Sequence, residues 1–328
     1  MGKHHLGFGL VAVAALVSAL AASAPAQAAT SAQPAVASHT VAATETPDGY
    51  WTSERMRSAV PGDVLADRAV WRASSTAVGH VARGLEQRVA GIEAKASAQT
   101  KAAKPKPNAL STAESVVPHI GKVFFTLGGQ NYVCSGNSVA AANKNTVSTA
   151  GHCLNEGPGA FATNFTFVPA YDNGAAPYGQ WNARSLHAPT QWSNAGDMTY
   201  DTGFAVVSPR NGQNLADVVG ASGLSFNAAR GQTYKAFGYP AASPFTGQKL
   251  ISCTGPASND PYNPQFAAQG IPCDMTGGSS GGPWFLGTSS SGYQNTVNSY
   301  GYGSRSTVMY GPYWGSVVQS TYQTAASS

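Results

Sequence analysis

Residues 273–283 read Cys-Asp-Met-Thr-Gly-Gly-Ser-Ser-Gly-Gly-Pro, and upstream of them residues 149–153 read Thr-Ala-Gly-His-Cys. A serine on a tight glycine turn can present its hydroxyl to a carbonyl carbon, and the N–H groups of Gly278 and Ser280 can bind the oxyanion that develops. Glycine suits such a turn because a substrate must approach the backbone closely. A flexible, solvated loop is the alternative interpretation of a Gly/Ser run. The apolar segment 283–286 that follows and the histidine motif upstream favour a catalytic loop.

The two motifs resemble those of the chymotrypsin-like serine proteases, in particular the secreted bacterial enzymes of the V8-like and glutamyl endopeptidase branch. The family's TA(A/G)HC matches Thr149–Cys153, and its G(D/N/S)SGGP matches Gly278–Pro283. The resemblance covers residues 117–325 and implies an all-β fold of two packed six-stranded-type β-barrels with the active site in the crevice between them. It also implies that Ser280 is the nucleophile, that His152 is the general base, and that the amides of Gly278 and Ser280 form the oxyanion hole.

The third member of the expected triad is an aspartate between the histidine and the serine, because the family order is His, Asp, Ser. Asp201 precedes the apolar, β-prone run 204–207, and this segment resembles the family's aspartate motif. A carboxylate at the mouth of a buried strand can fix the histidine tautomer and stabilise the imidazolium. Asp197 is the second candidate, whereas Asp172 lies in an Asp-Asn-Gly sequence that is typical of a turn. We therefore expect Asp201 to orient His152.

The chain begins with features of a secretory signal peptide. A basic start is followed by an apolar run from Leu6 to about Ala22 and by Ala26-Gln27-Ala28, which predicts a signal peptide over residues 1–28. A membrane anchor is the alternative, but the run is alanine-rich and shorter than about 20 strongly apolar residues. The sequence therefore predicts export.

Residues 29–107 differ in composition from the rest of the chain. They contain a helix-compatible stretch from Val64 to about Ala96, and they end in a stiff, charged linker at residues 101–107. We interpret residues 29–107 as a propeptide, a helical or disordered leader that guides folding or blocks the cleft. A disordered tail without an inhibitory role is the alternative. Residues 108–328 are then the protease domain.

The net charge of +4 does not indicate a nucleic-acid partner. From Asn108 to the end, the chain carries eight Lys/Arg and eight Asp/Glu, so the basic excess lies wholly in residues 1–107. A neutral domain without basic runs lacks the electrostatic footprint for a phosphate backbone.

All four cysteines lie in the predicted protease domain, and export to an oxidising compartment favours disulfides, for which three pairings exist. The resemblance implies the pair Cys134–Cys153, which would hold the histidine loop, and leaves Cys253–Cys273 to hold the segment that enters the serine loop. A zinc site is the alternative. The sequence has no Cys-x-x-Cys spacing and only three histidines in this domain, so we expect no metal.

Short β-prone segments and abundant turn residues run from Lys122 onward and predict an all-β domain. They include residues 123–127, 132–134, 146–149, 165–168, 204–207, 233–237, 249–253 and 296–300.

Substrate binding is predicted from two places. Asp274 lies six residues before Ser280, where trypsin-like relatives select Lys or Arg; structural hydrogen bonding is the alternative role. The segment Ser299-Tyr300-Gly301 resembles the family's S-W-G, whose backbone pairs with an extended substrate. Ser279 stands where the trypsin-type motif has an aspartate. Because a hydroxyl cannot hold a buried ammonium, activation by a new N-terminus is not expected.

Together these features predict a secreted, extracellular serine endopeptidase, made as a zymogen, that hydrolyses peptide bonds through an acyl-enzyme. We expect protein or peptide substrates, a monomer, no cofactor, no nucleic acid and no membrane association after signal removal. Two alternatives stay open. One is a catalytically inactive protease-like binding protein, which would usually lack a triad residue. The other is an esterase with the same triad, because esters also form acyl-enzymes.

Overall fold

The structure is a computed structural model that describes residues 1–4, 35–45, 49–73, 81, 83–94, 110–303 and 305–328. The chain divides into two units, residues 1–33 and 34–328. The predicted signal peptide lies almost wholly outside the described residues, as does the linker at 101–107. Every described residue beyond residue 4 belongs to the second unit.

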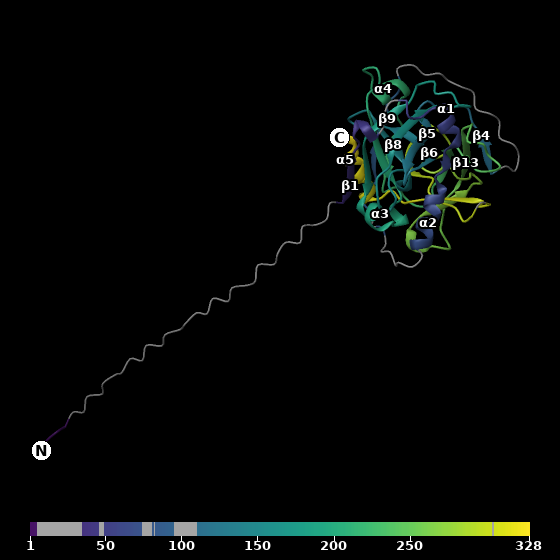
Figure 1. The fold of residues 1–328 in the computed structure, drawn as a ribbon. Helices are drawn as coiled ribbons and strands as arrows, with labels where there is room; N and C mark the ends of the chain where they lie inside the picture. Colours follow the sequence, from purple (N-terminus) through teal and green to yellow (C-terminus); the bar gives the residue numbers. More distant parts are fainter. Residues whose placement is uncertain (5–34, 46–48, 74–80, 82, 95–109, 304) are drawn as a thin grey trace. The chain divides into compact units, whose positions relative to one another are not determined.

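The second unit is mostly β-structure (Figure 1). Its described strands are β1 (Val36–Thr40), β2 (Val60–Pro61), β3 (Gln87–Val89), β4 (Ser111–Ala113), β5 (Ile120–Leu127), β6 (Gln130–Val139), β7 (Thr146–Thr149), β8 (Thr163–Pro169), β9 (Trp181–Pro189), β10 (Gly203–Val207), β11 (Gly223–Phe226), β12 (Thr233–Gly238), β13 (Ile251–Pro256), β14 (Ser258–Asn259), β15 (Gln269–Pro272), β16 (Pro283–Leu286), β17 (Tyr293–Val297) and β18 (Val308–Gly311). Its described α-helices are α1 (Ser53–Ser58), α2 (Asp63–Ala73), α3 (Thr190–Ala195), α4 (Leu215–Val219) and α5 (Ser316–Ala326). Short 3₁₀ helices are η1 (Ala43–Glu45), η2 (Gly151–Cys153), η3 (Met198–Tyr200) and η4 (Pro264–Phe266).

The first half of the predicted protease domain is a closed barrel. Six strands follow the order β9-β10-β7-β6-β5-β8, and β8 pairs back onto β9. Strand β5 illustrates how alternating apolar residues form the wall of this barrel. Val123, Phe125 and Leu127 face the barrel core, and Ile120 and Phe124 pack in a second apolar cluster on the other side. This alternation is the period of two that a strand requires when both of its faces are buried.

The second half holds a seven-stranded sheet, ordered β3-β11-β17-β16-β12-β13-β4, and a three-stranded sheet, β14-β15-β18. Strands β7 and β16 have the bounds expected from sequence, and the all-β prediction is confirmed. The serine loop connects β15 of the small sheet with β16 of the large one, and two rigid elements therefore hold it.

Helix α5 at the C-terminus was not expected from sequence. It packs on the first barrel through an aromatic group in which Tyr322 lies 5.7 Å from Phe204 and 5.4 Å from Phe226, between ring centroids. Trp314, just before the helix, stacks on Phe226 at 5.7 Å. No helix among the described residues combines the length and apolarity needed to cross a membrane.

The described part of the leader is folded onto the protease domain. It contains helices, as predicted, but the expected helix from Val64 to Ala96 ends at Ala73, and Gln87–Val89 is a strand. Strand β1 pairs with β9 over five residues, β2 pairs with β6 in parallel, and β3 pairs with β11. The leader therefore adds strands to the sheets of both halves.

Lys122 is a buried cation on the first barrel. Its side chain is 2% exposed, and its Nζ donates to the carbonyl of Gly247 at 3.0 Å. The ring of Tyr171 lies 4.5 Å from the ammonium, which is a cation–π distance. Burial lowers the pKa of Lys122 to about 7, because the charged form loses hydration that these contacts replace only in part.

We expect Lys122→Met to change the pH dependence of stability. In the wild type the unfolded state binds the Lys122 proton more tightly than the folded state, so this residue makes stability rise with pH between about 7 and 10. The substitution removes that slope, which is at most about 1.4 kcal/mol per pH unit. Urea unfolding of both proteins from pH 7 to 9.5 measures it. Parallel stability curves would contradict the prediction.

Candidate active site

His152 lies in η2, directly after β7 of the first barrel. Its side chain is 1% exposed, and its Nδ1 lies 2.8 Å from Oδ2 of Asp201. Its own backbone N–H donates to Oδ1 of the same carboxylate at 2.8 Å. The second ring nitrogen, Nε2, is buried and has no hydrogen-bond partner among the described residues.

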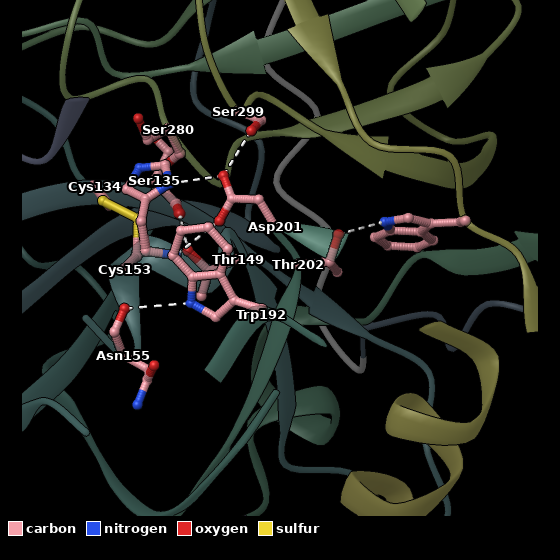
Figure 2. A network of polar contacts seen from close by, with 12 residues as sticks. Cys134, Ser135, Thr149, Cys153, Asn155, Trp192, Asp201, Thr202, Ser280 and Ser299 are labelled. Atoms are coloured by element: carbon pink, nitrogen blue, oxygen red, sulfur yellow. Dashed lines mark hydrogen bonds and ion pairs between the residues drawn. A yellow bond between two sulfur atoms is a disulfide. The ribbon is translucent and has the colours of Figure 1, made fainter. Parts of the chain in front are cut away.

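Asp201 follows η3 and precedes β10, so the structure puts the expected aspartate beside the histidine. It is fully buried, and Ser299 Oγ donates to its Oδ2 at 2.5 Å. Figure 2 shows Asp201, Ser299 and Ser280 in one network beside the Cys134–Cys153 disulfide. Three donated hydrogen bonds compensate the buried carboxylate.

The other aspartates considered from sequence have structural roles. Asp197 accepts the N–H of Thr199 at 2.9 Å as the N-cap of η3. Asp172 lies in the expected turn and pairs with Lys249 at 2.7 Å.

Ser280 lies in the turn before β16 and is 4% exposed. The turn has positive φ at Gly278 (93°) and at Gly281 (79°), a conformation that favours glycine. A Cβ atom at Gly281 would also overlap the side chain of Thr149. The glycines therefore let the serine loop pack directly on the strand that leads to the histidine.

Backbone hydrogen bonds around Ser280 leave two amides free. Ser279, Gly281 and Gly282 donate to carbonyls at 3.3, 2.8 and 3.0 Å. The N–H groups of Gly278 and Ser280 donate to no acceptor within the described part of the chain. Two free amides on either side of Ser279 are the arrangement that an oxyanion hole requires.

Ser135 links the first barrel to this loop and was missed by the sequence analysis. Its Oγ donates to the carbonyl of Gly278 at 2.9 Å, and its N–H donates to the carbonyl of Ser280 at 2.7 Å. In the sequence, the position of Ser135 directly after Cys134 could have identified it as a neighbour of the histidine loop. Ser279, which replaces the family's aspartate, donates instead to the carbonyl of Thr276 at 2.8 Å.

The four cysteines form the pairs Cys134–Cys153 and Cys253–Cys273, the pairing considered from sequence. Among the described residues, the possible metal ligands that lie close together are Cys134, Cys153 and His152. Because both sulfurs are engaged in a disulfide, this donor set does not fit a metal ion.

A cavity of about 120 Å³ adjoins Ser280. Its walls include Ser299, Tyr300 and Gly301, all three predicted to bind substrate, together with Met275 and other residues of the second half. Asp274 does not line this cavity, although its Oδ1 is buried and has no hydrogen-bond partner among the described residues. Residues 63, 66 and 67 of the leader complete the lining.

Tyr300, in the wall of the cavity, is held by the buried carboxylate of Asp260. Its hydroxyl donates to Asp260 at 2.7 Å, and Tyr302 donates to the same oxygen at 2.6 Å. Asp260 is 1% exposed. These contacts of Asp260 join segments that are far apart in the sequence, so they depend on the tertiary fold and have no local sequence signal.

No family model matches the chain. A curated extracellular metalloprotease of Bacillus subtilis (strain 168) is 25% identical over 147 residues, which are 45% of this chain. The match spans only 36% of that protein's length.

Solved structures match more completely. The protease Anisep from Arthrobacter nicotinovorans is 75% identical, and the match covers 66% of this chain and 100% of Anisep with a TM-score of 0.66. A thermostable serine protease, AL20, from an extremophilic microorganism is 52% identical, with 65% of this chain and 98% of AL20 covered and a TM-score of 0.63. A Glu endopeptidase, 21% identical with a TM-score of 0.53, covers 68% of this chain and 99% of its own, and shares the fold. With these relatives and this site, the chain belongs to the chymotrypsin-like serine proteases.

Proposed function

We propose that this protein is a secreted serine endopeptidase that cleaves peptide bonds through Ser280, His152 and Asp201. The observation that carries the proposal is the buried His152–Asp201 pair beside a serine whose loop has two free amides. Serine-type peptidase activity agrees with the relatives of 75% and 52% identity.

In acylation, Ser280 Oγ attacks the carbonyl carbon of the scissile bond, and His152 Nε2 takes the hydroxyl proton. Asp201 holds Nδ1–H, so that Nε2 carries the free lone pair, and it stabilises the imidazolium that forms. The N–H groups of Gly278 and Ser280 stabilise the oxyanion. His152 then returns the proton to the leaving amine as the C–N bond breaks.

Deacylation repeats the sequence with water. His152 removes a proton from the water that attacks the acyl carbon, and returns a proton to Ser280 Oγ as the acid product leaves. Each proton that His152 takes is given back within the same half-reaction, so this chemistry needs no cofactor.

We assign residues 1–28 to a signal peptide, 29–107 to a propeptide and 108–328 to the protease domain. The two disulfides agree with folding in an oxidising compartment. Anisep corresponds to 66% of this chain, which agrees with an enzyme that acts without its leader. We propose that the enzyme acts as a monomer.

Protein or peptide substrates would bind along Ser299–Gly301 as an added strand. Selection of a basic side chain by Asp274 stays a prediction. The buried Oδ1 of Asp274, which has no hydrogen-bond partner among the described residues, agrees with this prediction, whereas the absence of Asp274 from the lining of the cavity beside Ser280 disfavours it. The apolar Met275 in the cavity wall favours an uncharged side chain instead.

We expect a fluorophosphonate probe to label the processed enzyme at Ser280, and Ser280→Ala to abolish both labelling and peptide hydrolysis. Ser279→Ala is the matched control, because its hydroxyl bonds only to the Thr276 carbonyl. Labelling with peptide and ester turnover would support the proposal. Ester turnover alone would indicate an esterase, and no labelling of the processed protein would indicate a binding protein.

We expect Asp201→Asn to lower kcat by about 10³–10⁴-fold, because an amide facing Nδ1 favours the wrong histidine tautomer. Asp197→Asn changes the same charge four residues away, where the carboxylate caps η3, and should lower kcat less than about threefold, because asparagine caps a helix about as well as aspartate. Steady-state kinetics on a peptide substrate give both values. Equal losses in the two variants would contradict the assignment of Asp201.

A further inference from the structure

The cavity beside Ser280 is not built by the protease domain alone. Asp63, Ala66 and Asp67 of α2 line it together with Ser280 and Ser299. With the leader in place, Ser280 is only 4% exposed. The leader therefore occupies space that a substrate needs.

The path of the leader fixes this position. Strand β2 pairs in parallel with Tyr132 and Val133 of β6, and the N–H of Gly62 donates to the carbonyl of Val133 at 2.9 Å. A Cβ atom at Gly62 would lie 2.6 Å from Cys134 Sγ. The chain thus passes against the disulfide that holds the histidine loop, and it enters α2 directly over the cavity.

Asp63, the first residue of α2, packs its carboxyl group against Gly277. A Cβ atom at Gly277 would overlap this carboxyl group. Oδ1 of Asp63 is buried and has no hydrogen-bond partner among the described residues. Since Gly277 directly precedes the amide of Gly278, the carboxyl group lies next to the proposed oxyanion hole.

The buried face of α2 anchors it. Ala66 and Ala69 are each 1% exposed and belong to an apolar cluster with Trp192, Met198 and Tyr300. Trp192 also contacts the catalytic histidine, with ring centroids 6.4 Å apart. Moving α2 away would expose this cluster, so the helix is a docked element and not a loose cover.

The docked segment is not in the form that a serine protease cuts. A substrate would pair as an extended strand with Ser299–Gly301. From Asp63 to Ala73 the leader is helical, and no backbone hydrogen bond joins the described leader residues to Ser299–Gly301. In this geometry the leader can block the cavity without being cleaved by the enzyme.

We infer that residues 60–73 are a built-in inhibitor of this protease, which binds the substrate cavity through Asp63 and α2 and keeps Ser280 covered until the leader is released. This rests on the proposed function. It goes beyond a propeptide in general, because it names the inhibitory contact as the Asp63 carboxyl group against Gly277.

The test is the rate at which a fluorophosphonate probe labels intact, uncleaved proprotein. We expect Ala69→Glu to raise this rate at least tenfold, because a charge in the apolar cluster expels α2, whereas Glu54→Ala leaves it unchanged, since Glu54 is an exposed carboxylate of α1. A wild-type rate in the Ala69→Glu variant would overturn the inference.

A reciprocal variant tests the contact from the protease side. Gly277→Ala should also speed labelling of the proprotein, because its methyl group displaces the Asp63 carboxyl group. Gly277 lines the cavity, so each rate is divided by the rate of the same variant after proteolytic removal of the leader. A ratio equal to the wild-type ratio would contradict the contact. No labelling after leader removal would instead contradict the proposed function.

The pH dependence of probe labelling gives an independent test of the Asp63 contact. Burial, and then the charge of Asp67 on the same helix, raises the pKa of Asp63, whereas the nearby His152 acts in the opposite direction. The docked leader therefore favours protonated Asp63, and docking weakens as the pH rises through that raised pKa. We expect the labelling ratio of proprotein to leader-free enzyme to increase from pH 4 to pH 8, and Asp63→Asn to flatten this increase. An unchanged slope in the variant would exclude Asp63 as its source.

Discussion

The buried carboxylate of Asp201 is the constraint on which the catalytic geometry depends. An unpaired carboxylate in a dry interior costs several kcal/mol, so the fold must supply donors. Two come from His152 after β7, and the third comes from Ser299, which follows β17 in the second half. The Ser135–Ser280 backbone bond makes a second connection between the halves. The His152–Asp201 pair is formed within the first half, and the bonds of Ser299 and Ser135 connect it and the serine loop across the two halves.

Several positions of the site require glycine because there is no space for a Cβ atom, and not only because the backbone needs glycine's conformational freedom. A Cβ atom at Gly151 would lie 2.9 Å from Asp201 Oδ1 and from the ring of Trp192. At Gly282 it would overlap the carbonyl of Phe237. The Gly/Ser run, which in isolation is typical of a flexible linker, is thus closely packed against its neighbours. Close approach of backbones around Ser280 leaves no room for side chains, and this rigidity is what a preorganised oxyanion hole needs.

The all-β fold and the two catalytic motifs could be predicted from sequence, because each depends on residues that are close together in the chain. The histidine and serine motifs each adjoin a strand, and Asp201 heads an apolar run, so residue type and neighbours sufficed. The leader could not be predicted in this way. Gln87–Val89 looks compatible with a helix, but pairing with β11 across more than 130 residues overrides its local preference. The contact of Asp63 with Gly277 likewise could not be predicted, because the two residues are far apart in the sequence and no local motif links them.

The spread of the leader over both halves determines what cleavage can achieve. Strands β1, β2 and β3 pair with β9, β6 and β11, and a cut in the linker at residues 101–107 breaks none of these pairings. Before the cut, the covalent connection holds the inhibitor at an effective concentration on the order of millimolar. After it, the same contacts bind a separate chain, whose concentration falls on dilution. Proteolysis of the linker would then convert a permanent block into a reversible one, and full activity would follow from dissociation or degradation of the leader rather than from the cut itself.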